Sequence, residues 1–88
     1  MMRCIAIDDE PLALSLLEDN IKRIPFLDLV GTSHDVFEAM DIMEKTQIDL
    51  IFIDIQMPRL NGFDYIKSLQ NKPLVIFITA YENYAIQG

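Results

Sequence analysis

Unbroken apolar runs are the feature that most restricts how this chain can fold. Three predicted strands, Arg3–Ile7, Asp49–Ile53 and Leu74–Thr79, consist mainly of such runs. A half-buried strand alternates apolar and polar side chains, whereas an unbroken short run is typical of a strand covered on both faces. The runs therefore favour a parallel sheet that is buried between helices.

The segment between the first two strands has the signals of a helix. Pro11 suits the first helical turn, Asp9 or Glu10 can cap it, and Pro25 ends it. Apolar residues recur at helical spacing, which predicts that they form the face packed on the sheet. These residues are Leu12, Leu16, Leu17, Ile21 and Ile24.

Strand and helix signals continue to alternate along the chain. A second strand is expected at Phe26–Ser33, and Asp35 and Glu38 form a capping-box-like start for a second helix. The apolar face of that helix would comprise Val36, Ala39, Met40 and Met43. Further helices are expected around residues 63–69, after an Asn-Gly turn, and from residue 81. This order predicts an open α/β sheet with right-handed crossovers.

Composition excludes several classes of protein. The chain has 88 residues, a length typical of one small domain, and 51% are hydrophobic, which is ample for a core. Its formal charge of -7 and the lack of a basic cluster argue against direct contact with nucleic acid. No apolar run approaches the roughly 18 residues of a membrane span. The single cysteine, Cys4, is expected to be a buried hydrophobe in a reducing cytoplasm.

Acidic residues stand where the apolar strands end. Asp8 and Asp9 follow the first strand, Asp54 follows the third, and Thr79 closes the fourth. Ligands of open parallel sheets bind at the carboxyl ends of the strands. Carboxylates gathered there without His or Cys favour Mg²⁺, or Mn²⁺, over zinc. An Asp can also attack phosphorus to give an aspartyl phosphate. Each residue taken alone could equally be a helix cap or a strand terminator.

Three motifs together resemble a known family. They are D-D-E-P from Asp8, D-I-Q-M-P-R-L-N-G from Asp54 and T-A-Y from Thr79. They are similar to the receiver domain of bacterial two-component response regulators, and most of all to the LytTR (LytR/AgrA-type) subgroup. The resemblance covers essentially the whole chain. It implies a flavodoxin-like sheet with strand order 2-1-3-4, which places the first and third strands side by side.

The resemblance also implies a role for each motif residue. Asp54 would be the phosphoacceptor, phosphorylated by a sensor histidine kinase, and a separate LytTR domain that binds DNA would be the output. The other implied roles are direct Mg²⁺ binding by Asp9, binding through water by Asp8, a carbonyl ligand from Gln56, switching by Thr79, phosphoryl access beside Ala80, and loop shaping by Met57, Pro58 and Gly62.

The chain departs from the family pattern at its end. Receivers continue into a fifth strand and helix, with a switch aromatic and a phosphate-binding lysine, so residues 1–88 are expected to form an incomplete receiver domain. Leu74–Thr79 would then be an apolar edge strand, which favours self-association.

Two other functions compete with the receiver hypothesis. One is a receiver-like interaction module that is not phosphorylated, which the missing lysine favours. The other is a phosphatase with an aspartyl nucleophile. Such enzymes usually have a second Asp two residues after the first, and that position here is Gln56.

Overall fold

The structure is a computed structural model, and it describes residues 1–54 and 73–78. Helices expected around residues 63–69 and from residue 81 lie outside the described residues. The elements in chain order are β1 (Met2–Ile7), α1 (Pro11–Lys22), β2 (Leu27–Ser33), α2 (Val36–Lys45), β3 (Leu50–Asp54) and β4 (Leu74–Ile78). Each predicted strand and helix within the described residues is present, with ends that differ from the prediction by no more than three residues.

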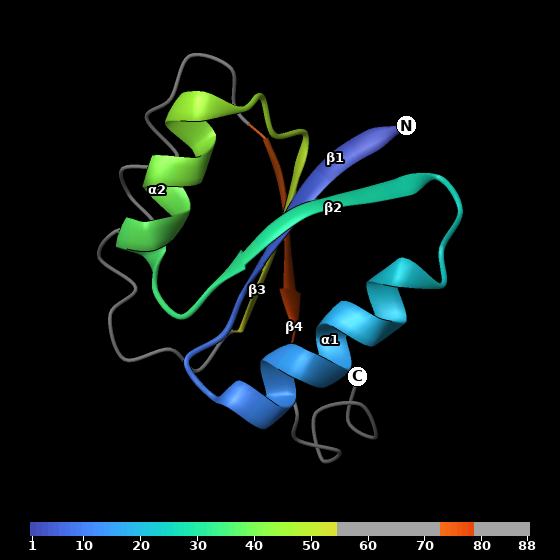
Figure 1. The fold of residues 1–88 in the computed structure, drawn as a ribbon, viewed down its shortest axis with the longest axis vertical. Coiled ribbons are helices and arrows are strands. Elements are labelled where there is room, and N and C mark those ends of the chain that lie inside the picture. Colours follow the sequence, from blue (N-terminus) through green and yellow to red (C-terminus); the bar gives the residue numbers. More distant parts are fainter. Residues whose placement is uncertain (55–72, 79–88) are drawn as a thin grey trace.

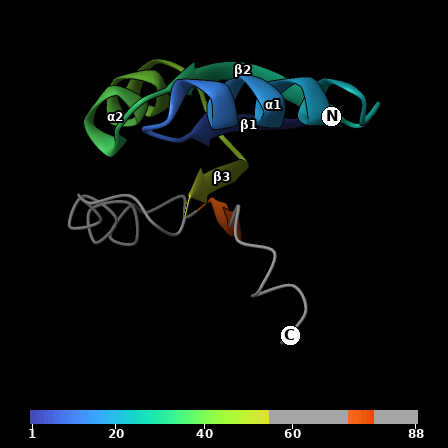
Figure 2. The ribbon, with the colours of Figure 1, turned by 90° about the horizontal axis from the view of Figure 1, so that it is seen from below.

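The four strands form one parallel sheet in the order β2-β1-β3-β4. Figure 2 shows them stacked in this order, with β2 at the top and β4 at the bottom. This confirms the predicted α/β class and the strand order that the resemblance implied. Because β1 pairs with β3, the chain segments that follow Ile7 and Ile53 emerge beside each other at the same end of the sheet.

The two helices cover opposite faces of the sheet (Figure 1). Alternate residues of β1 and β3 therefore enter two separate cores. The core under α2 contains Ile5, Ile7, Val36, Ala39, Ile48, Ile51 and Ile53. The core under α1 contains Cys4, Ala6, Leu14, Ile21, Leu27, Leu50 and Phe52. Burial on both faces explains why these strands are apolar throughout.

The predicted inner face of α1 was partly wrong. Leu12 is 80% exposed and Leu16 is 63% exposed, whereas Leu14 is buried. Leu14 and Ile21 lie seven residues apart, two helical turns, and so share one face. Leucines at residues 12, 14, 16 and 17 make the first turns of this helix apolar all round, so periodicity alone could not select the buried side.

The predicted start of α2 is confirmed. Asp35 is the N-cap, and its Oδ1 accepts a hydrogen bond of 2.8 Å from the backbone N–H of Glu38. Oε1 of Glu38 accepts a hydrogen bond of 2.8 Å from the backbone N–H of His34.

Within residues 1–54 and 73–78, no helix has both the length and the apolar character needed to cross a membrane.

Strand β2 carries one extra residue relative to β1. Cys4 pairs with Leu29 and Ile5 pairs with Gly31, so no residue of β1 pairs with Val30. This is a β-bulge, and it advances the rest of β2 by one residue. After the bulge Ile7 pairs with Ser33, which brings the end of β2 level with the end of β1.

Candidate functional site

Three carboxylates converge at the carboxyl end of the sheet. Ile7 pairs with Ile53, so the next residues, Asp8 and Asp54, lie at the same level at the ends of the two paired strands. One ligand oxygen each from Asp8, Asp9 and Asp54 lies within 4.8 Å of the other two. The structure therefore brings together the three acids that the sequence singled out, and we call them the acidic cluster.

Asp8 is the most enclosed member of the acidic cluster, with 5% of its surface exposed. Its Oδ1 accepts a 2.9 Å hydrogen bond from the backbone N–H of Glu10, and its own N–H donates to the carbonyl of Ser33 at 3.1 Å. Burial raises the pKa of Asp8, the bond from Glu10 lowers it, and the charges of Asp54 and Asp9 raise it further. The net effect is a raised pKa, as expected for carboxylates held close together.

The other two members are more accessible. Asp9 is exposed and Asp54 is partly exposed. Glu10 is the residue that caps α1, since its side chain accepts from the N–H of Leu12 at 3.4 Å. Of the two acids predicted as possible caps, Glu10 has this role, and Asp9 is placed in the acidic cluster instead.

The donor set suits a hard divalent cation. The acidic cluster offers only carboxylate oxygens, and hard cations such as Mg²⁺ and Mn²⁺ prefer oxygen ligands. A cation would also offset the repulsion that contributes to the raised pKa of Asp8. The residues present therefore fit a magnesium ion, with Asp9 and Asp54 as the accessible ligands.

Strand β4 leads the chain towards the acidic cluster. Its last residue, Ile78, pairs with Asp54, and Thr79 is the next residue in the sequence. Thr79 itself lies outside the described residues. The same holds for the other predicted site residues, which are Gln56, Met57, Pro58, Gly62 and Ala80.

Ser33 is a neighbour of the site that sequence reasoning missed. It is 4% exposed. Its carbonyl accepts a hydrogen bond from the N–H of Asp8, and its hydroxyl donates one to the carbonyl of Asp35 at 2.9 Å. Ser33 thus links the start of α2 to the first acid. The only sequence signal was its place at the end of the second strand, which does not reveal that the bulge at Val30 aligns it with Asp8.

Comparison with known proteins identifies close relatives of this chain. The family model described as "Response regulator receiver domain" matches residues 4–88. The transcriptional regulatory protein BtsR of Salmonella typhi is 34% identical over 90 residues, which span all of this chain and 38% of BtsR. The sensory transduction protein LytT of Bacillus anthracis is 33% identical over 91 residues, which span all of this chain and 37% of LytT.

A solved structure shares the fold. The response regulatory domain of mrkE from Klebsiella pneumoniae superposes with a TM-score of 0.77 at 28% identity. The superposition covers 98% of this chain and 73% of that one. The chain spans little more than a third of the length of its curated relatives, and most of this solved domain.

Proposed function

Because this chain belongs to the response regulator receiver family, we propose that Asp54 accepts a phosphoryl group from the phosphohistidine of a sensor histidine kinase. The observation that carries the proposal is the convergence of Asp8, Asp9 and Asp54 within 4.8 Å at the carboxyl end of the sheet. The receiver family is regulatory. The proposed role is therefore that of a signal acceptor. Phosphorylation of Asp54 would change how this domain acts on a partner.

The proposed transfer needs little from the protein beyond position and charge. One carboxylate oxygen of Asp54 forms a bond to phosphorus while the N–P bond of the phosphohistidine breaks. The electron pair of that bond stays on the imidazole nitrogen, which takes up a proton. The position of Asp54, at the end of β3 and partly exposed, suits attack on a donor that approaches from solvent.

We propose that Mg²⁺, or Mn²⁺ in its place, is bound at this site. Asp9 and Asp54 would be direct ligands, Asp8 would act through water, and the carbonyl of Gln56 would complete the protein's share. The ion would supply positive charge against the phosphoryl oxygens. Support comes from the all-carboxylate donor set and from the raised pKa of Asp8, which reflects burial and negative neighbours.

The response to phosphorylation is proposed to begin at Thr79. Its hydroxyl would bind a phosphoryl oxygen, Ala80 would leave room for access, and the loop with Met57, Pro58 and Gly62 would adjust. The pairing of Asp54 with Ile78 supports this role for Thr79, which is the next residue of the chain.

The output of the longer protein is proposed from its relatives. BtsR is named a transcriptional regulatory protein and LytT a sensory transduction protein. We propose that this chain, in the cytoplasm, controls a downstream DNA-binding domain of the LytTR type and makes no contact with nucleic acid or membrane itself. The chain has 14 acidic and 7 basic side chains, and this negative balance agrees with the absence of direct contact with nucleic acid.

The deciding experiment is phosphorylation of the full-length protein by acetyl phosphate with Mg²⁺. We expect intact-mass spectrometry to show the addition of one phosphoryl group, and we expect Asp54→Asn or EDTA to abolish it. Asp19→Asn, which changes an exposed acid on α1, is the matched control and should be phosphorylated like the wild type. No mass increase in the wild type would favour an interaction module that is not phosphorylated. Continuous release of phosphate from an ester would favour the phosphatase.

A further inference from the structure

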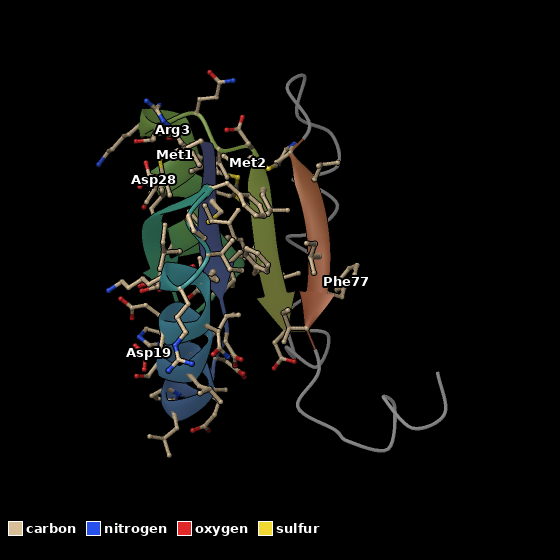
Figure 3. All side chains as sticks on the ribbon, turned by 90° about the vertical axis from the view of Figure 1, so that its right-hand side faces the viewer. Met1, Met2, Arg3, Asp19, Asp28 and Phe77 are labelled. Carbon is tan, nitrogen blue, oxygen red and sulfur yellow. The ribbon has the colours of Figure 1, made fainter. Side chains whose placement is uncertain are left out.

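Asp49 binds two neighbouring strands at the end of the sheet opposite the acidic cluster. Its backbone N–H donates to the carbonyl of Arg3 at 2.7 Å, and its Oδ2 accepts from the backbone N–H of Arg3 at 3.0 Å. Its own carbonyl accepts from the N–H of Leu74 at 2.9 Å. One residue thus connects the starts of β1, β3 and β4. Figure 3 shows Arg3 at this end, opposite the arrowheads of the strands.

The register of β1 against β3 requires a contact that distinguishes one alignment from the next. The paired runs Cys4–Ile7 and Leu50–Ile53 are apolar at every position and buried on both faces. A slip by one residue would turn each side chain to the other face, but every exchange would still put one apolar side chain in place of another. Hydrophobic patterning therefore specifies the register less strongly than in a strand with one polar face. Backbone hydrogen bonds repeat along parallel strands and can form again after a slip.

A slip would matter at the other end of the strands. One residue of a parallel strand corresponds to about 3.3 Å along its axis. A shift of that size would separate Asp8 from Asp54, whose ligand oxygens now lie within 4.8 Å. The geometry of the acidic cluster therefore depends on the register of β1 against β3.

We propose that Asp49 is a positioning residue that fixes this register and, through it, the spacing of the acidic cluster. The carboxylate is the part that identifies a single alignment, because its bond to the N–H of Arg3 forms only when these two residues are level. The donor is a backbone group, so the side chain of Arg3 is not required. The proposal rests on the proposed function only for its metal readout.

The test compares Asp49→Ala and Asp49→Asn with the wild type in the full-length protein. Asn retains a carbonyl oxygen that can accept from Arg3, whereas Ala does not. Arg3→Ala keeps the backbone donor, and Asp19→Ala removes an exposed charge elsewhere. NMR reports the cross-strand pairing of Ile5 with Ile51 and the hydrogen exchange of the Arg3 amide. Calorimetric titration with Mg²⁺ reports the spacing of the acids.

We expect Asp49→Ala to weaken Mg²⁺ binding by at least about threefold. The loss should be smaller than the roughly 10- to 100-fold loss that is typical of direct outer-shell partners. The Arg3 amide should exchange at least about tenfold faster, and the contacts between Ile5 and Ile51 should weaken, as expected where local opening becomes easier. Asp49→Asn should restore most of both properties, and the two control variants should match the wild type.

The negative outcomes are distinct. If Asp49→Ala folds with wild-type pairing and wild-type Mg²⁺ affinity, the proposal is wrong. If it does not fold, the proposal is overturned by an Arg3 amide that exchanges in the wild type at the rate of a free peptide, or by an Asp49→Asn variant that behaves no better. A wild-type protein that binds no Mg²⁺ contradicts the proposed metal site instead, and the NMR measurements still decide the role of Asp49.

Discussion

Asp8 and Asp54 lie one residue beyond the paired residues Ile7 and Ile53, and their carboxylates face a common point together with Asp9. Asp8 follows the last residue of β1, and Asp54 is itself the last residue of β3 and pairs with Ile78. The apolar strands run to the edge of the sheet and leave the charged residues at their ends, where parallel strands direct their following residues to the same side. The proximity of residues 46 positions apart in the chain thus follows from the pairing of β1 with β3.

Mg²⁺ should stabilise the folded protein. A ligand that binds only the native state raises the free energy of unfolding by about 2.7 kcal/mol at 100 times its Kd. Urea unfolding of the full-length protein with and without MgCl₂ measures the effect, with NaCl used to match ionic strength. Asp9→Asn should lose most of this stabilisation, whereas Asp19→Asn should keep it. An equal response in both variants would place the metal elsewhere.

Asp8→Asn should stabilise the metal-free protein at neutral pH. The pKa of Asp8 in the folded state is raised above its ordinary value of 3.8, mainly by burial and also by Asp54 and Asp9. Between 3.8 and the raised pKa the native state binds more protons than the unfolded state, so stability falls as pH rises through that window. Asn removes the charge and keeps an oxygen for the N–H of Glu10.

The check on this pH dependence is a series of urea titrations in EDTA. The advantage of Asp8→Asn should be full above the raised pKa of Asp8 and should shrink as pH falls towards 3.8. An advantage that stays constant down to pH values well below that would mean that the charge of Asp8 is not its cause.

Truncation of two leucines of α1 should change the free energy of unfolding by very different amounts. Leu14 is buried, so Leu14→Ala should lower the free energy of unfolding by about 2 to 5 kcal/mol. Leu12 is 80% exposed, so Leu12→Ala should change it by about 0.5 kcal/mol or less. Urea unfolding of the two variants measures the difference. Similar losses for both would mean that α1 presents a different face to the sheet.

Strand β4 should mediate self-association of the 88-residue chain. Within the described residues β4 pairs with β3 only, and Leu74, Ile76 and Phe77 are 64%, 43% and 45% exposed. Figure 3 shows the ring of Phe77 directed away from the sheet. Apolar edges of this kind pair with other chains. Light scattering at high concentration should show oligomers that Ile76→Lys reduces, while Val30→Lys at the opposite edge should leave them intact. A monomer at every concentration would contradict this prediction.

The sequence predicted the elements well and their packing less well. Unbroken apolar runs at Cys4–Ile7 and Leu50–Ile53 were enough to predict buried parallel strands, because few other structures cover both faces of a strand. The runs carried no information about which strand lies beside which, and that order came from the family resemblance. On α1 the burial of Leu14 could not be predicted because neighbouring positions are also leucine.

The same division applies to the site. The position of Asp8 and Asp54 after apolar strands predicted that both acids lie at the carboxyl edge of the sheet, and the strand order implied by the family resemblance made them neighbours. The roles of Ser33 and Asp49 could not be predicted. The bond between Ser33 and Asp8 and the bonds of Asp49 join residues far apart in the chain, and the partners of Asp49 include Arg3, 46 residues earlier. Such contacts depend on the register of the finished sheet, which no local pattern contains.

The bulge at Val30 has a consequence for how this chain tolerates changes in length. The extra residue is taken up inside β2, before Ser33, and the pairing after it is regular. Deletion of Val30 would close the ladder into an even register without moving Ser33 away from Ile7. Homologous sequences that are one residue shorter at this point can therefore keep the same arrangement of acids, and alignments should place their gap at residue 30 rather than in the loop that precedes α2.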